Sequence, residues 1–172
     1  YGLFPYPERM RWALWPARVM QQLGLDRIVE SMGLTKILPE KLARMYDQLP
    51  RLQAAGARFP EVLPAKGPKR ARVALFTGCV ADAMFGQTNW ATARVLQENG
   101  CEVVIPRQQA CCGAIHYHNG ADGPALMLAR QNAQAFASPD IDAVIINVAG
   151  CGSMLKDYGH IAHETEPGND PL

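Results

Sequence analysis

Residues 72–79 read RVALFTGC, an apolar run that ends in a Thr-Gly pair and a cysteine. A run of this kind before a glycine predicts a short buried strand at 72–76. The pattern returns twice along the chain, because EVVI at 102–105 ends at a proline and AVIINV at 143–148 leads into Ala-Gly-Cys. The second half of the chain therefore contains three predicted strands, and at least one cysteine follows each of them.

Helical segments separate the three predicted strands. Residues 87–99 stop at Gly100, which is a natural cap for the end of a helix. Residues 121–136 place mostly small or apolar side chains on one helical face: Ala125, Ala129, Asn132 and Phe136. Strands that alternate with helices of this length predict βαβ units with right-handed crossovers, and hence a parallel sheet in a three-layer α/β domain.

The first third of the chain lacks strand-like runs and is rich in helix formers. Residues 8–25 predict a helix that Pro16 must kink or interrupt, and a second helix is expected to start at Pro39. The stretch GARFPEVLPAKGPKR holds three prolines and two glycines and is typical of an extended linker. We therefore expect a helical connector arm, a Pro/Gly-rich linker and an α/β domain, with these bounds: 1–55, 56–70 and 71–172.

Charge is divided unevenly along the chain. Its 17 Lys and Arg and 16 Asp and Glu give a net charge of +1, but residues 1–72 carry 13 of the basic and 6 of the acidic residues. Two interpretations of the basic, aromatic arm remain open. It packs on its own domain or on sequence outside this chain, or it presents Trp12 and Trp15 to a membrane or a partner subunit. A hydrophobic content of 48% without a long apolar run argues against a disordered chain, a collagen-like repeat and a transmembrane protein.

Four of the five cysteines follow predicted strands: Cys79, Cys111, Cys112 and Cys151. The loops after parallel strands share the carboxyl edge of a sheet, where open α/β folds bind their ligands. Each of the four also lies close to a predicted helix start, whose dipole favours the thiolate, the form that binds metal. We therefore expect these thiols to converge as metal or cluster ligands, although 31 residues lie between the first two and 38 between the last two.

Two simpler roles for the cysteines are less favoured. Buried free cysteines usually behave as small apolar residues, but chance would not place four of them at one sheet edge. A disulfide between the adjacent Cys111 and Cys112 would close a strained ring, and the compartment is expected to be reducing. Four thiolates can bind either a tetrahedral zinc ion or a four-iron cluster, so the ligands alone do not distinguish these two cofactors. Cys101 opens the second predicted strand at the opposite edge, and we interpret it as an ordinary buried thiol.

The segments around the four cysteines resemble a known family. FTGCVADAMF, IPRQQACCGAIHYHNGA and INVAGCGSMLKDYG are similar to the cysteine-rich CCG domain of the heterodisulfide reductases and their relatives. Within that superfamily, CCGAIHYHNG and AGCGSMLKDYG look most like the iron-sulfur subunit of glycolate oxidase. The resemblance covers residues 72–160, and the arm is similar to the connector after the ferredoxin domain of that family. It implies an internal fragment, since the ferredoxin domain and a second CCG unit are absent.

The resemblance implies an electron-transfer subunit. In such complexes a flavin-containing partner oxidises glycolate to glyoxylate, and electrons pass through iron-sulfur centres toward a membrane quinone. By position, the family's cluster cysteines match Cys79, Cys111, Cys112 and Cys151, so a [4Fe–4S] cluster is the expected cofactor, with zinc as the alternative. The family's final motif is often CxxC, but Met154 stands at its second position here and leaves four thiolates instead of five.

Further polar residues near the predicted site are weaker candidates. His116 and His118 could supply a nitrogen ligand or a proton, but we expect them to make hydrogen bonds or to face solvent. Lys156 could offset an anionic cluster, but a solvated lysine is the commoner outcome. Asn147 and Asp82 are expected to make local turn hydrogen bonds.

Three functions stay open at the level of sequence. The leading one is an iron-sulfur electron carrier of a glycolate oxidase complex, cytoplasmic and in peripheral contact with the membrane. The alternatives are a CCG-type redox catalyst that acts on a disulfide or quinone, and a structural zinc domain that assembles other subunits. The carrier is favoured because no substrate-binding constellation accompanies the cysteines. No complete active site and no nucleic-acid-binding patch is expected in this chain.

Overall fold

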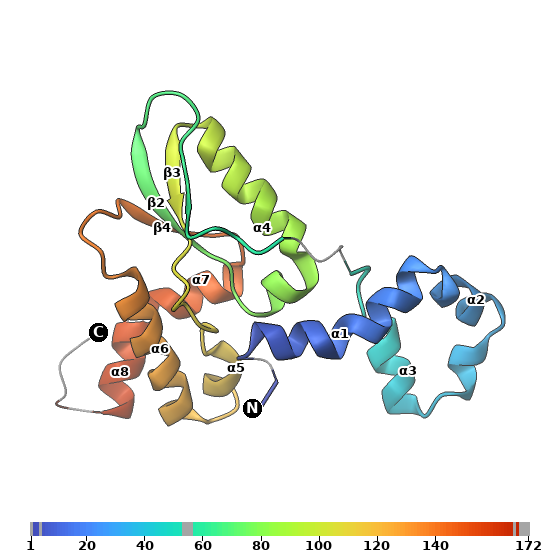
Figure 1. The fold of residues 1–172 in the computed structure, drawn as a ribbon. Helices are drawn as coiled ribbons and strands as arrows, with labels where there is room; N and C mark the ends of the chain where they lie inside the picture. Colours follow the sequence, from blue (N-terminus) through green and yellow to red (C-terminus); the bar gives the residue numbers. More distant parts are fainter. Residues whose placement is uncertain (1, 4, 53–56, 167, 169–172) are drawn as a thin grey trace.

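The computed structural model describes residues 2–3, 5–52, 57–166 and 168, and its centre is a four-stranded sheet (Figure 1). The strands run in the order β1-β3-β2-β4 across the sheet. Their bounds are Val62–Leu63 for β1, Ala71–Phe76 for β2, Cys101–Val104 for β3 and Ala143–Ile146 for β4. The α/β fold and its three parallel strands are confirmed. The fourth strand, β1, was not predicted and pairs antiparallel with β3.

Strand β2 is the axis of the sheet. Its first four residues pair in parallel with β3, and its last four pair in parallel with β4. The chain therefore moves from β2 to one neighbour and then crosses back over β2 to the other. At such a reversal the loops after β2 and β4 diverge to opposite faces of the sheet, and in open α/β folds this is the place where ligands bind.

Helices cover both faces of the sheet (Figure 1). Helix α4 packs through Ala93 and Leu96 onto the face with Val73, Leu75 and Val103. The opposite face packs against the helices that follow β3 and β4, and its core includes Phe76, Ala125, Ala129 and Ile161. The helices are α4 at Val80–Glu98, α5 at Ala114–Tyr117, α6 at Asp122–Phe136, α7 at Ala149–Lys156 and α8 at Tyr158–Thr165.

Helix α4 begins earlier than the sequence predicted. The backbone leaves helical geometry at Phe85, where φ is −126° and ψ is 35°, so the helix has two sections. The section after this break corresponds to the predicted helix at 87–99. The first section begins directly after Cys79 and was not predicted, because a helical run was expected only beyond Gly86.

The arm consists of α1 at Pro7–Gln22, α2 at Leu25–Ser31, the short 3-10 helix η1 at Leu34–Ile37 and α3 at Glu40–Asp47. Helix α1 continues through Pro16, so the proline does not interrupt it. It packs on α4: Met10 is buried, and the Arg18 guanidinium donates a 2.8 Å hydrogen bond to the Ala83 carbonyl oxygen. One side of α1 therefore packs on the domain, while Trp12 and Trp15 on this helix stay exposed. Helices α2, η1 and α3 project away from the sheet (Figure 1).

The described part of the predicted linker is tied to the domain. It contributes β1 to the sheet, and the Phe59 ring stacks on the Trp90 ring at 4.1 Å between centroids. Lys66 and Lys69 form ion pairs with Glu98 and Glu102. Several basic residues of the first part of the chain thus form ion pairs with acidic residues of the second part.

Some expectations fall outside the described residues. These include residues 53–56 at the boundary of arm and linker, the aromatic residues Tyr1 and Phe4, and most of the segment after α8. Among the helices that the structure describes, none combines the length and apolarity needed to cross a membrane.

Candidate functional site

The carboxyl edge of the sheet carries the four cysteines that follow the parallel strands. Cys79 is the N-cap residue of α4, Cys111 and Cys112 precede α5, and Cys151 lies in the first turn of α7. The Sγ atoms of Cys79 and Cys111 are 3.2 Å apart, and the Cys112 thiol interacts with those of Cys111 and Cys151. The structure thus brings together all four residues that the sequence placed at this edge.

Most of this cysteine group is buried. Cys79, Cys111 and Cys112 belong to the apolar cluster around Phe76, and Cys151 is half-buried against it. Cys101 lies at the other end of β3, where it pairs with Ala71, and it is half-buried instead of fully buried. Burial favours neutral thiols, so any thiolate here depends on hydrogen bonds from its neighbours.

The contacts between the thiols separate their proton affinities. Hydrogen bonds from Cys111 and then Cys151 lower the pKa of the Cys112 thiol to about 3. The same contacts raise the pKa of Cys111 and of Cys151, while the contact with Cys111 lowers the pKa of Cys79. The contacts therefore lower the proton affinity of Cys79 and Cys112 and raise that of Cys111 and Cys151.

Two buried side chains hold the CCG loop, which we define as Ala110–Gly113. The Asn132 carboxamide accepts a 2.8 Å hydrogen bond from the Ala110 amide and donates one of 3.0 Å to the Cys111 carbonyl oxygen. It also donates to the Tyr158 hydroxyl, which donates a 3.0 Å bond to the Cys112 carbonyl oxygen. Burial raises the pKa of Tyr158, so its hydroxyl stays a donor. These two roles were not predicted from the sequence, although an amide in a stripe of small side chains was a usable signal.

Amide side chains also fix the loops after β2 and β4. Gln109 accepts from the Thr77 amide at 2.8 Å and donates to the Leu75 carbonyl oxygen at 3.2 Å. Asn89, which is buried on α4, donates to the Thr77 carbonyl oxygen and accepts from Asn147 at 2.8 Å. Asn147 therefore makes a long-range hydrogen bond instead of the expected local turn bond.

The glycine of the CCG loop is required by both conformation and space. Gly113 has a φ of +88°, and a Cβ atom there would lie 3.2 Å from the Ala125 carbonyl oxygen and 3.5 Å from the Cε of Met154. Met154 is buried, and it stands at the second position of the final cysteine motif. Its thioether fills space beside the thiols.

The remaining polar residues singled out in the sequence differ in burial and in their partners. His116 is buried in α5, whereas His118 and Lys156 are not. Asp82 does not make the expected local turn bond, because its carboxylate pairs with the Arg11 guanidinium at 2.6 Å. Burial raises the pKa of Asp82 despite the opposing effect of Arg11. The arm is thus bound to α4 through Asp82, three residues after Cys79.

The donor chemistry of the site fits a soft metal or an iron-sulfur cluster, since four thiols from three loops share one buried place. Among the described residues, no three His, Cys, Asp or Glu side chains have the arrangement that would hold a single metal ion. The thiols instead contact one another in a row. The residues that could hold a cluster are the four cysteines themselves.

Comparison with known proteins gives two family matches. The cysteine-rich CCG domain model matches residues 73–156, which include all four converging cysteines. A model described as the linker region of the glycolate oxidase iron-sulfur subunit matches residues 1–49. No solved structure gives a significant match.

Curated relatives are similar over much of the chain. The probable glycolate oxidase iron-sulfur subunit of Bacillus subtilis is 44% identical over 163 residues, 94% of this chain and 37% of that protein. The glycolate oxidase iron-sulfur subunit of Escherichia coli is 30% identical over 155 residues, 85% of this chain and 37% of that protein. Lactate utilization protein A of Geobacillus kaustophilus is 37% identical over 92 residues, 54% of this chain and 38% of that protein.

The chain spans a little over a third of the length of these relatives. The two family matches nevertheless include both the helical arm and the whole cysteine group. The chain therefore belongs to the cysteine-rich CCG domain family, and it carries in front of that domain the linker region of glycolate oxidase iron-sulfur subunits.

Proposed function

We propose that this chain is the cluster-binding part of an iron-sulfur electron-transfer subunit of a glycolate-oxidising complex. The observation that carries the proposal is the convergence of four thiols from three loops at the carboxyl edge of the parallel strands. The names of the relatives support the iron-sulfur assignment. The proposal also includes the partners and the location. Flavin-containing subunits donate the electrons, and a quinone accepts them. The location is cytoplasmic, with peripheral association to the membrane.

In this proposal Cys79, Cys111, Cys112 and Cys151 hold the cluster, which is of the [4Fe–4S] type and supplies one-electron transfer when bound. The chain's own contribution is positioning. Asn132 and Tyr158 fix the backbone of the CCG loop, so the thiol positions do not depend on the cluster alone. The N-terminal ends of α4 and α7 lie at Cys79 and Cys151 and favour negative charge on sulfur.

The surroundings of the thiols favour a carrier over a catalyst. The described side chains packed around them are mainly apolar, among them Phe76, Met154 and Ile161. A catalyst of disulfide or quinone chemistry needs open space beside the sulfurs for its substrate, whereas three of these four cysteines are buried in a packed cluster. Apolar packing instead excludes water, which suits electron transfer.

For the partner subunits we propose the outer face of α1 as a contact surface. Trp12 and Trp15 are 75% and 57% exposed there, and large exposed aromatic side chains are common at protein interfaces. The arginines on this helix are unsuitable probes, because Arg11 and Arg18 bind the chain's own α4. The informative variant of the full-length subunit is therefore Trp12→Ala with Trp15→Ala. It should lower co-purification of the flavin-containing subunits while iron content is unchanged.

Anaerobic purification of the full-length subunit with metal analysis tests the function directly. Clusters elsewhere in a longer subunit would add iron, so the informative quantity is the difference between the unaltered subunit and its Cys111→Ser variant. We expect the variant to lose about four iron and four sulfide per chain, with reduced broad visible absorption. Zinc in place of this iron would support the structural alternative. Equal iron and zinc contents in both proteins would contradict the ligand assignment.

A further inference from the structure

Strand β4 lies at an edge of the sheet but has the sequence of an interior strand. It reads AVII and continues with Asn-Val, so both of its faces are apolar. Parallel strands covered on both faces have such continuous apolar runs, whereas edge strands are normally short or protected by charge and proline. In the described part of the chain, β4 pairs with β2 alone, and its Val144 is 38% exposed.

The opposite edge of the same sheet shows how this protein terminates a sheet. Strand β1 has two residues, Val62–Leu63, with prolines on both sides at positions 60 and 64 and a lysine at 66. Each of these features discourages another strand from adding there. Strand β4 is twice as long, and no charge or proline lies within it or after it before Lys156, although Pro139, Asp140 and Asp142 precede it. The two edges therefore differ most at the carboxyl end of β4.

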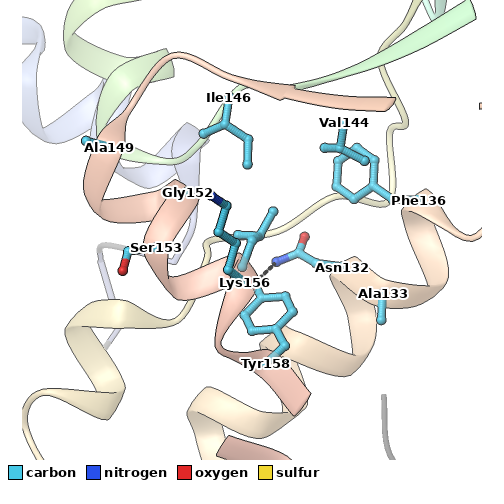
Figure 2. Close-up of a pocket in the computed structure, with 11 residues that line it drawn as sticks. Asn132, Ala133, Phe136, Val144, Ile146, Ala149, Gly152, Ser153, Lys156 and Tyr158 are labelled. Carbon is cyan, nitrogen blue, oxygen red and sulfur yellow. Dashed lines mark hydrogen bonds between the residues drawn. The ribbon is translucent and has the colours of Figure 1, made fainter. Parts of the chain in front are cut away.

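An apolar groove runs beside β4 (Figure 2). Its volume is about 720 Å³, and apolar side chains of three elements line it: Ala133 and Phe136 of α6, Val144 and Ile146 of β4, and Leu155 of α7. Lys156 and Ser153 are exposed at the groove. Because no charged side chain is buried in it, the groove fits apolar side chains better than a polar small molecule.

The groove and the unpaired strand form one continuous feature. Val144 and Ile146 line the groove, while Ile145 packs on the opposite, α4-covered face. An extended peptide that added to β4 would place alternate apolar side chains in this groove while its backbone paired with the strand. More than half of each relative described above lies outside the matched region, so the full-length subunit has chain available for this role.

We infer that β4 and its groove are the docking surface for another segment of the same full-length subunit, which adds a strand to this edge. The inference is independent of which metal the thiols bind. It concerns residues 143–146 and the groove, not the cysteine group.

Hydrogen exchange on the full-length subunit tests the inference, with the two edges as internal comparison. The informative backbone amides of residues 143–146 are those that point away from β2, because the others already bond to that strand. They should exchange at least tenfold more slowly than the amide of β1 that points away from β3. Their protection should not change when the protein is diluted. Equal exchange at the two edges would overturn the inference. Protection that falls on dilution would overturn it as well, because a second copy would then be the occupant.

A matched pair of variants adds a second measurement. Val144 and Val62 are edge-strand valines with 38% and 40% exposure in this structure. In the full-length subunit, Val144→Lys should abolish the protection of the informative amides of residues 143–146 while the interior strand β2 stays protected. Val62→Lys should leave both strands unchanged. Equal, small effects of the two substitutions on exchange would show that nothing covers β4.

Discussion

The two ends of the parallel strands are built by different means. At the amino end, the connections rely on backbone hydrogen bonds, such as Arg70 to Gly100 at 2.8 Å, and on exposed ion pairs around Glu102. At the carboxyl end, buried carboxamides of Asn89 and Asn132 bind loop backbone. Buried polar side chains are costly unless every group is paired. Their concentration at one end indicates that the loops with the thiols must be held in place.

The largest effect is expected when a cysteine at the carboxyl end of the parallel strands is replaced. In the full-length subunit, Cys112→Ser should remove about four iron per chain and loosen the CCG loop, because a set of four thiols has no spare ligand. Iron and sulfide analysis after anaerobic purification measures the loss. Retention of all the iron by this variant would remove Cys112 from the ligand set.

The amide clamp formed by Asn132 should show the next largest effect. Asn132→Ala removes bonds to Ala110, Cys111 and Tyr158 and leaves buried groups unpaired, so the free energy of unfolding should fall by about 2–4 kcal/mol. Asn119→Ala is the control: Asn119 is exposed and its side chain bonds within its own turn, and a loss below about 0.5 kcal/mol is expected. Denaturant unfolding of the two variants compares them, and equal losses would show that the clamp has no special role.

The glycines allow a comparison of the two ends at equal backbone strain. Gly113 at the carboxyl end and Gly100 at the amino end have φ of +88° and +80°, and a Cβ atom would approach backbone oxygens at 3.2 and 2.8 Å. Alanine at either position should cost about 1–3 kcal/mol of stability. Iron content should fall with Gly113→Ala alone, because only that loop carries proposed ligands, whereas Cys101 beside Gly100 is not one. An equal loss of iron from both variants would mean that general destabilisation, not loop geometry, controls binding.

The smallest effect is expected for Cys101→Ser. Its thiol is half-buried at the amino end, so a hydroxyl there should cost about 1 kcal/mol and leave iron content unchanged. Thermal unfolding and iron analysis measure both. Loss of iron from this variant would contradict the proposal that only the cysteines at the carboxyl end are ligands.

The sequence predicted the positions of the cysteines because one rule covers all of them. Loops after parallel strands share an edge, and apolar runs before Cys79 and Cys151 are readable in one dimension. Strand β1 could not be predicted, since two residues between prolines carry no periodicity. The position of Asn132 among small side chains hinted at a role, but the bonds of Asn132 and Tyr158 could not be predicted, because their partners lie 21 and 46 residues away. The pair of Arg11 and Asp82 spans 71 residues and depends on how α1 docks.

The distribution of the four thiols over three loops has a consequence for the order of events during biogenesis. In an unfolded chain, sulfurs separated by 31 or 38 residues are on the order of 30 Å apart, and bringing them together costs loop-closure entropy. They become neighbours only when β2 has paired with both β3 and β4, and parallel pairing of this kind is slow to form. A cluster would therefore have to be delivered to a chain in which β2, β3 and β4 have already paired. The rate of sheet formation then sets the earliest moment at which the subunit can be loaded.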